Sequence, residues 1–110
     1  MKKKKITGKK LKKMIADHNL WYDSHGNEGA RADFSNYDLS GKYLFGVFLA
    51  GAIFKGANLE DSNLTSGDYS DSDFEGASFK GSKIKCSCFE GANLKNTDFT
   101  ETNLDGAKLS

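Results

Sequence analysis

From residue 34 onward, the chain has a large apolar residue at every fifth position. The residues between them are mostly polar or small. The sixteen apolar positions are Phe34, Leu39, Leu44, Leu49, Phe54, Leu59, Leu64, Tyr69, Phe74, Phe79, Ile84, Phe89, Leu94, Phe99, Leu104 and Leu109. A period of five fits neither an α-helix, with about 3.6 residues per turn, nor a flat strand, with two. The pattern therefore requires a turn in every repeat.

The positions on either side of each apolar residue also have a fixed character. Two residues before it the side chain is mostly Ala, Ser, Thr or Gly, as in Ala52 and Ser72. Two residues after it the chain mostly carries Gly, Asn or Asp, as in Gly56 and Asn96. These residues adopt a positive φ at little cost and so supply the turn. The chain is thus predicted to wind into a coil that keeps the large residue inside.

The segments ADFSN, ANLED, SDFEG, ANLKN and TNLDG, taken in this register, resemble the pentapeptide-repeat family over residues 32–110. The resemblance implies an all-β solenoid, a right-handed quadrilateral β-helix with four repeats, or twenty residues, in each coil. Sixteen repeats then make four coils. Residues 31–110 would form this β-helix, and residues 1–30 a basic N-terminal arm and capping helix.

Charges on the outer surface support a coil of twenty residues. Residues twenty apart become vertical neighbours, and like charges there would repel each other. The columns that alternate in sign are Lys55 with Glu75 and Lys95, Glu60 with Lys80, and Lys85 with Asp105.

The N-terminal segment has the pattern of an amphipathic helix. Leu11, Met14, Ile15 and His18 are spaced so that they share one helical face, which predicts a helix over residues 9–19. A helix this short forms when its apolar face is buried. We therefore expect it to cover the first coil as a cap, with Trp21 nearby and His18 packed against the coil.

The stretch KYLFGVFLAG, residues 42–51, breaks the pattern because aromatic residues occupy outward positions. Three interpretations are open: a wall covered by the chain's own N-terminal helix, which we favour, a surface for a partner, and a membrane anchor. The longest apolar run, residues 43–54, is too short to span a bilayer, which takes about 20 residues. The candidate cap or interaction surface consists of Leu11, Met14, Ile15, Trp21, Tyr43, Phe45, Phe48 and Ile53.

The C-terminal end raises a second possibility of association. The repeat continues to Leu109, so we expect the last coil to present an open apolar face through Phe99, Leu104 and Leu109. Exposed strand edges favour association unless they are covered. We predict a two-fold homodimer through this coil.

Charge and cysteine content bear on the possible partners and on the cellular compartment. Residues 1–30 carry eight Lys and three acidic residues, whereas residues 31–110 carry eight basic and twelve acidic ones. The lysine run, residues 2–5 with Lys9, Lys10, Lys12 and Lys13, could attract phosphate-rich partners or anionic lipid, but a solvated, disordered tail is favoured. No secretory signal follows it, so we expect a cytoplasmic protein in which Cys86 and Cys88 are unpaired and bind no metal.

No catalytic pattern is present. The two His are not spaced for a metal, the glycines follow the five-residue period, and we expect no catalytic residues and no cofactor. The favoured function is a non-enzymatic scaffold for an unidentified protein partner, without direct nucleic-acid binding. The alternative comes from the resemblance: some members of the family mimic duplex DNA and bind DNA gyrase. A body whose net charge is only −4 is weakly acidic for such a mimic.

Overall fold

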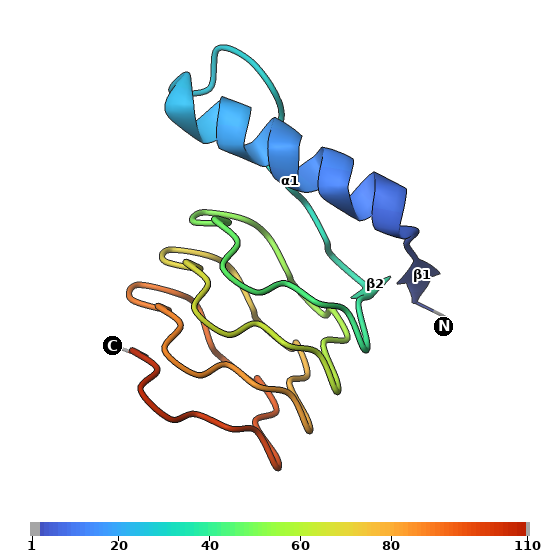
Figure 1. Cartoon of the computed structure of the whole chain (residues 1–110), viewed down its shortest axis with the longest axis vertical. Coiled ribbons are helices and arrows are strands. Elements are labelled where there is room, and N and C mark those ends of the chain that lie inside the picture. Colours follow the sequence, from blue (N-terminus) through green and yellow to red (C-terminus); the bar gives the residue numbers. More distant parts are fainter. Residues whose placement is uncertain (1–2, 110) are drawn as a thin grey trace.

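The computed structural model describes residues 3–109; Met1, Lys2 and Ser110 lie outside the described residues. Its elements are β1 (Lys4–Lys5), α1 (Gly8–Asp23) and β2 (Tyr37–Asp38). Figure 1 shows α1 lying across one end of a stack of coils, with the C-terminal coil at the far end of the stack. The whole measures 38 × 31 × 22 Å.

The coils repeat every twenty residues. Parallel β-bridges join residues twenty apart along the body, beginning with Asp33 and Ile53 and ending with Cys88 and Lys108. The predicted register is confirmed by these pairs. Most bridges are isolated, because the turns leave only about three extended residues on each side of a coil. The described residues therefore contain only two short strands, although the body is held together by β pairing.

The large apolar residues lie inside the coils, and their rings stack along the axis. Phe54 lies between Phe34 and Phe74, with ring centroids 5.1 and 4.6 Å away. The first twelve of the sixteen positions, from Phe34 to Phe89, are fully buried. Small residues two positions earlier make room for them: a Cβ at Gly67 would overlap the ring of Tyr69.

The expectation that all sixteen apolar residues are buried is wrong for the last coil, residues 94–109. Leu94 and Phe99 are half-buried, and Leu104 and Leu109 are 38% and 41% exposed. Within residues 3–109, the backbone bridges join this coil only to the coil before it, so no further coil covers these side chains. They keep the internal position of the repeat without being enclosed.

The turns have the backbone conformation that the repeat predicts. Each residue two positions after an apolar one, from Asn36 to Gly106, has a positive φ. Seven of these residues are not glycine, and they include Cys86 and Glu101, with φ of 58° and 55°. Residues other than Gly, Asn and Asp adopt this conformation at a cost of about 1–2 kcal/mol.

Replacing Glu101 by Gly is therefore expected to raise the free energy of unfolding by about 1 kcal/mol, because glycine adopts positive φ without strain. Urea titration followed by circular dichroism measures the change. Glu90→Gly is the matched control: Glu90 is exposed and has no positive φ, so the same substitution there should destabilise. Equal effects at both positions would contradict the assignment of strain to Glu101.

Residues 3–6 are ordered against the body, which corrects the expectation of a disordered tail, although the lysine side chains there are exposed to solvent. β1 pairs in parallel with β2, and the Lys4 amide donates to the Asn36 carbonyl at 3.0 Å. Ile6, which follows β1, is buried. The edge of the first coil offers backbone acceptors, and Tyr37 offers an aromatic face to the ammonium group of Lys4 at 5.4 Å from the ring centroid. These contacts hold the basic segment in place.

The helix is longer than predicted. It was expected over residues 9–19, but α1 runs from Gly8 to Asp23 and so includes Trp21. The Thr7 hydroxyl accepts a hydrogen bond from the Lys10 amide at 3.1 Å and begins the helix as an N-cap. The extra turn follows from packing of Trp21 on the first coil.

Within residues 3–109, no helix combines the length and the apolar character needed to cross a membrane.

Candidate functional site

The eight residues of the candidate surface separate into a covered and an uncovered group. Leu11 is buried, and Met14 and Ile15 pack partly buried against the core. Trp21, Phe48 and Ile53 are half-buried, whereas Tyr43 and Phe45 are exposed. We call the contact between α1 and the first coil, residues 34–53, the junction. Six of the eight candidate residues are thus buried or half-buried, and only Tyr43 and Phe45 are exposed.

His18 is the central polar residue of the junction. Its side chain is fully buried, its Nδ1 accepts a hydrogen bond from the Ala32 amide at 3.0 Å, and its Nε2 lies 2.7 Å from the Ala50 carbonyl oxygen. Because Nδ1 accepts, Nε2 must carry the proton and donate to Ala50, so the imidazole is neutral. Burial lowers the pKa of His18 more than the Ala50 hydrogen bond raises it, and the nearby Arg31 charge lowers it further.

Aromatic residues at the end of α1 cover the first coil beside His18. The Tyr22 ring meets the Phe48 ring edge-on, with centroids 4.7 Å apart. The Arg31 guanidinium lies 5.8 Å from the Trp21 ring centroid, and its Nε donates to the Gly51 carbonyl at 2.5 Å. Phe48 is therefore part of the junction. Arg31 was not predicted as part of this contact, because its only signal in the sequence is a basic side chain immediately before the first repeat.

Tyr43 and Phe45 lie outside the junction. Their side chains are 71% and 52% exposed, and their rings stack with centroids 6.0 Å apart and planes 10° from parallel. They flank Leu44, on the side of the body that continues with the outward residues beside Leu64, Ile84 and Leu104. We call this side the aromatic wall. Its two rings form an apolar platform facing solvent.

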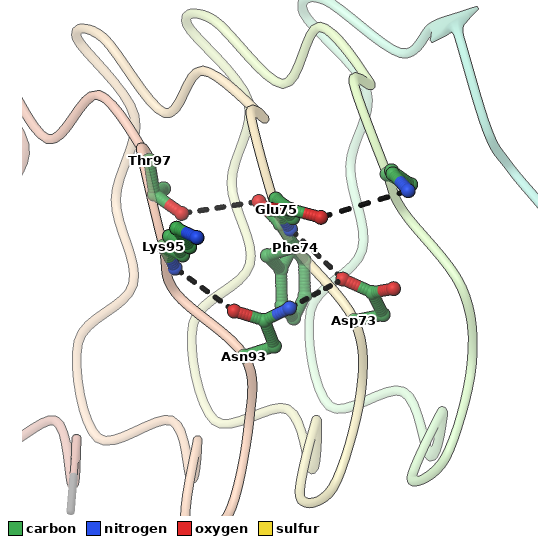
Figure 2. A network of polar contacts seen from close by, with 7 residues as sticks. Asp73, Phe74, Glu75, Asn93, Lys95 and Thr97 are labelled. Carbon is green, nitrogen blue, oxygen red and sulfur yellow. Dashed lines mark hydrogen bonds and ion pairs between the residues drawn. The ribbon is translucent and has the colours of Figure 1, made fainter.

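A local hydrogen bond explains what the outward residues normally do. In ten of the sixteen repeats, the residue before the large apolar side chain accepts a hydrogen bond from the amide of the residue that follows that side chain. Figure 2 shows two examples: Asp73 accepts from the Glu75 amide at 3.0 Å, and Asn93 accepts from the Lys95 amide at 3.1 Å. The acceptors are Asp33, Asp38, Asn58, Asn63, Asp68, Asp73, Ser78, Asn93, Asp98 and Asn103. These bonds satisfy an amide that the pairing between coils leaves free.

Four of these carboxylates, Asp33, Asp38, Asp68 and Asp98, also accept a hydrogen bond from a hydroxyl. The hydroxyls of Ser35, Ser40 and Thr100, and then the amides of the same residues, hold the pKa of Asp33, Asp38 and Asp98 below its usual range. The ionised form is favoured because it is the better hydrogen-bond acceptor.

Six repeats depart from this rule, and the residues in their acceptor position are Tyr43, Phe48, Ile53, Lys83, Cys88 and Lys108. Phe48 is explained by its contact with Tyr22. Tyr43 is not explained by the junction, since most of its side chain faces solvent. Lys83 lies two coils from Tyr43 in the same column of bridges. On the aromatic wall, the local hydrogen bond is therefore missing in the repeats of Tyr43 and Lys83.

Tyr43→Asn is expected to raise the free energy of unfolding by about 0.5–1 kcal/mol. Asn63, the bridge partner of Tyr43, accepts from the Thr65 amide at 3.0 Å, and an Asn at position 43 would accept from the Phe45 amide in the same way. Chemical denaturation measures the gain. Tyr43→Leu, which removes the ring without supplying an acceptor, is the control. A gain of the same size in both variants would contradict the explanation.

The predicted dimer residues lie away from the junction. Phe99, Leu104 and Leu109 belong to the last coil, at the opposite end of the stack from α1 (Figure 1). The two candidate surfaces are thus separate.

Cys86 and Cys88 are free thiols on the outside of the body. The sulfur of Cys88 lies 3.2 Å from the Ser70 hydroxyl. Across residues 3–109, no group of three or more His, Cys, Asp or Glu is placed to hold a metal ion.

Comparison with known proteins places the chain in a family. The family described as pentapeptide repeats matches residues 30–66, 43–81, 57–96 and 87–110, with eight copies of the family's repeat unit. The chain belongs to the pentapeptide-repeat family. Proteins of this family fold as right-handed quadrilateral β-helices and are generally non-catalytic structural or interaction proteins. No curated protein matches the chain.

Solved structures agree with this assignment. A pentapeptide-repeat protein of Nostoc PCC 7120 is 23% identical, with a TM-score of 0.73 over 86% of this chain and 74% of that one. A pentapeptide-repeat protein of the Arabidopsis thaliana thylakoid lumen is 32% identical, with a TM-score of 0.67 over 70% of this chain and 54% of that one.

The DNA-mimic alternative gains no specific support. The fluoroquinolone-resistance protein QnrB1 is 19% identical over 74% of this chain and 48% of its own, with a TM-score of only 0.40. The outer walls carry both signs of charge, and Lys55 and Glu75 form an ion pair at 3.6 Å between neighbouring coils. The other two predicted columns form no ion pair within residues 3–109.

Proposed function

We propose that this protein is a non-enzymatic scaffold that binds another protein through Tyr43 and Phe45. The observation that carries the proposal is that these rings are 71% and 52% exposed, whereas Phe48 in the same stretch is covered by α1. Contiguous apolar surface on a soluble domain often marks an interaction site. The proposal involves no cofactor and no nucleic acid. The free thiols of Cys86 and Cys88 suit a reducing compartment, and we place the protein in the cytoplasm.

In this proposal the scaffold is a β-helix of four coils, residues 31–110, capped by residues 1–30. The cap is supported by the burial of Leu11 and Ile6, by the hydrogen bonds of His18, and by the pairing of β1 with β2. A solenoid end without such cover presents unpaired backbone groups and invites stacking. α1 leaves the aromatic wall open while closing the end.

Affinity capture from an extract of the cells that produce the protein tests the proposal. The matched variant is Tyr43→Asn with Phe45→Thr, which copies Asn63 and Thr65 of the next coil and preserves the local hydrogen bond. We call it the wall variant. A protein retained by the wild type and lost from the wall variant supports the proposal. If both capture the same proteins equally, Tyr43 and Phe45 are not the interaction site.

The proposal also includes a homodimer through the last coil. The exposed side chains of Leu104 and Leu109, with the half-buried Phe99, form an apolar edge that a second copy related by a two-fold axis would cover. Light scattering at micromolar concentration is expected to give twice the monomer mass of 12.0 kDa, and Leu104→Glu is expected to return it to the monomer value. Tyr43→Glu is the control and should leave the dimer intact. A monomeric wild type would refute the dimer.

A further inference from the structure

The aromatic wall carries an excess of positive charge two coils further along the stack than the rings of Tyr43 and Phe45. Lys83 and Lys85 are both exposed, and they flank Ile84 two coils from Tyr43. Within residues 3–109, neither lysine forms an ion pair. At about 4.8 Å per coil, the lysines lie about 10 Å from the rings along the axis.

The other three walls have the opposite balance. The outward residues of the aromatic wall include two Lys and one acidic residue, Asp105. The walls beside Phe34, Leu39 and Leu49 each carry one acidic residue or more in excess over their lysines. The exposed apolar platform and the unpaired positive charge therefore lie on the same side of the body.

We infer that the partner bound at Tyr43 and Phe45 is an extended acidic protein segment that lies along the aromatic wall, an inference that rests on the proposed function. A large apolar side chain of the segment packs on the two rings. Carboxylates about three residues away reach Lys83 and Lys85, because an extended chain advances about 3.3 Å per residue. The ammonium groups of Lys83 and Lys85 form no ion pair within residues 3–109, so they are free to attract the carboxylates of the segment.

A narrow segment fits this wall better than a membrane surface does. The corner that leads into the wall carries Asp61 and Glu101, both exposed. A broad anionic lipid surface brought against the rings and lysines would also approach these carboxylates, and like charges repel. A single extended chain meets the lysines without covering the corner.

Selection from a library of random displayed peptides tests the inference. Peptides of about eight residues reach about 26 Å when extended, which is enough to follow the wall. With the whole chain as bait, we expect enrichment of peptides that combine a large apolar residue with Asp or Glu about three positions away. Their affinity, measured by fluorescence anisotropy of synthetic copies, should fall about tenfold for the wall variant and for Lys83→Gln with Lys85→Gln.

The matched control removes the same charge from other walls. Lys80→Gln with Lys95→Gln lowers the net charge equally, at two lysines outside the aromatic wall, and should leave the affinity unchanged. Higher salt should weaken the wild-type complex, because the ion pairs are exposed.

The outcomes separate this inference from the proposed function. If selected peptides need Tyr43 and Phe45 but show no acidic preference and ignore Lys83 and Lys85, the acidic partner is wrong and the protein-binding scaffold stands. If no peptide distinguishes the wild type from the wall variant, the extended acidic segment is wrong, and the affinity capture alone decides the protein-binding scaffold. Binding to vesicles containing phosphatidylserine that depends on Lys83 and Lys85, without peptide enrichment, would replace the protein segment by a lipid surface.

Discussion

Phe74→Ala is expected to lower the free energy of unfolding by about 3–5 kcal/mol. The Phe74 side chain is fully buried, its ring stacks on Phe54 at 4.6 Å with planes 7° from parallel, and it also contacts the rings of Tyr69, Phe79 and Phe89. Coils above and below hold these neighbours in place, so they cannot collapse into the space that the ring leaves. Urea titration followed by far-ultraviolet circular dichroism measures the loss.

Phe99→Ala is the matched control for this prediction. Phe99 occupies the same position of the repeat, but it is half-buried, and within residues 3–109 its ring stacks on Phe79 alone. We expect a loss of about 1–2 kcal/mol, since less apolar surface leaves water at this position. If the two substitutions cost the same, the last coil is enclosed in solution, and the homodimer would be the first explanation to examine.

The body of the fold was predictable because one rule acts at every position. Leu59 and Phe79 are inside, and Gly56 and Asn96 have positive φ, for the same reason that their equivalents do in every other repeat. A solenoid is held together by contacts between adjacent coils, so a period in sequence is also a distance in space. No contact between distant, unrelated segments had to be guessed.

The ends were less predictable, because there the contacts follow no period. Lys4 and Lys5 form a strand only because the edge of the first coil presents Tyr37 and Asp38 to them. Nothing in a run of lysines favours a strand. α1 extends to Asp23 because Trp21 packs against the first coil at Gly51. Both outcomes depend on a partner that local sequence does not specify.

The eight residues of the candidate surface were predicted to act together, but α1 covers some of them and leaves Tyr43 and Phe45 exposed. The sequence marked Tyr43, Phe45 and Phe48 as equally unusual. Only the direction in which α1 crosses the coil places Tyr22 on Phe48 and leaves Tyr43 and Phe45 exposed. One signal was present and unused: Asp, Asn or Ser precedes most of the large apolar residues, and Tyr43 and Phe48 are among the exceptions.

His18→Ala is expected to lower the free energy of unfolding by about 2–4 kcal/mol at neutral pH. The substitution leaves the Ala32 amide and the Ala50 carbonyl without their partner at a buried site, and each such group costs about 1–3 kcal/mol. The wild type should also lose stability as the pH falls. An unfolded histidine binds a proton below about pH 6.5, whereas burial lowers the pKa of the folded His18. Between those two pKa values the unfolded chain binds more protons, so acid favours unfolding.

The pH window separates His18 from the carboxylates. Asp33, Asp38 and Asp98 have lowered pKa values, so their contribution is lost only below the usual range of an aspartate, near pH 4. Urea titrations between about pH 7.5 and pH 5 thus report on histidine, with Trp21, the single tryptophan, as a fluorescent probe of the junction. His25→Ala is the control, because His25 is exposed. The dependence should vanish in His18→Ala and persist in His25→Ala; its survival in the former would show that His18 is not the group that acid protonates.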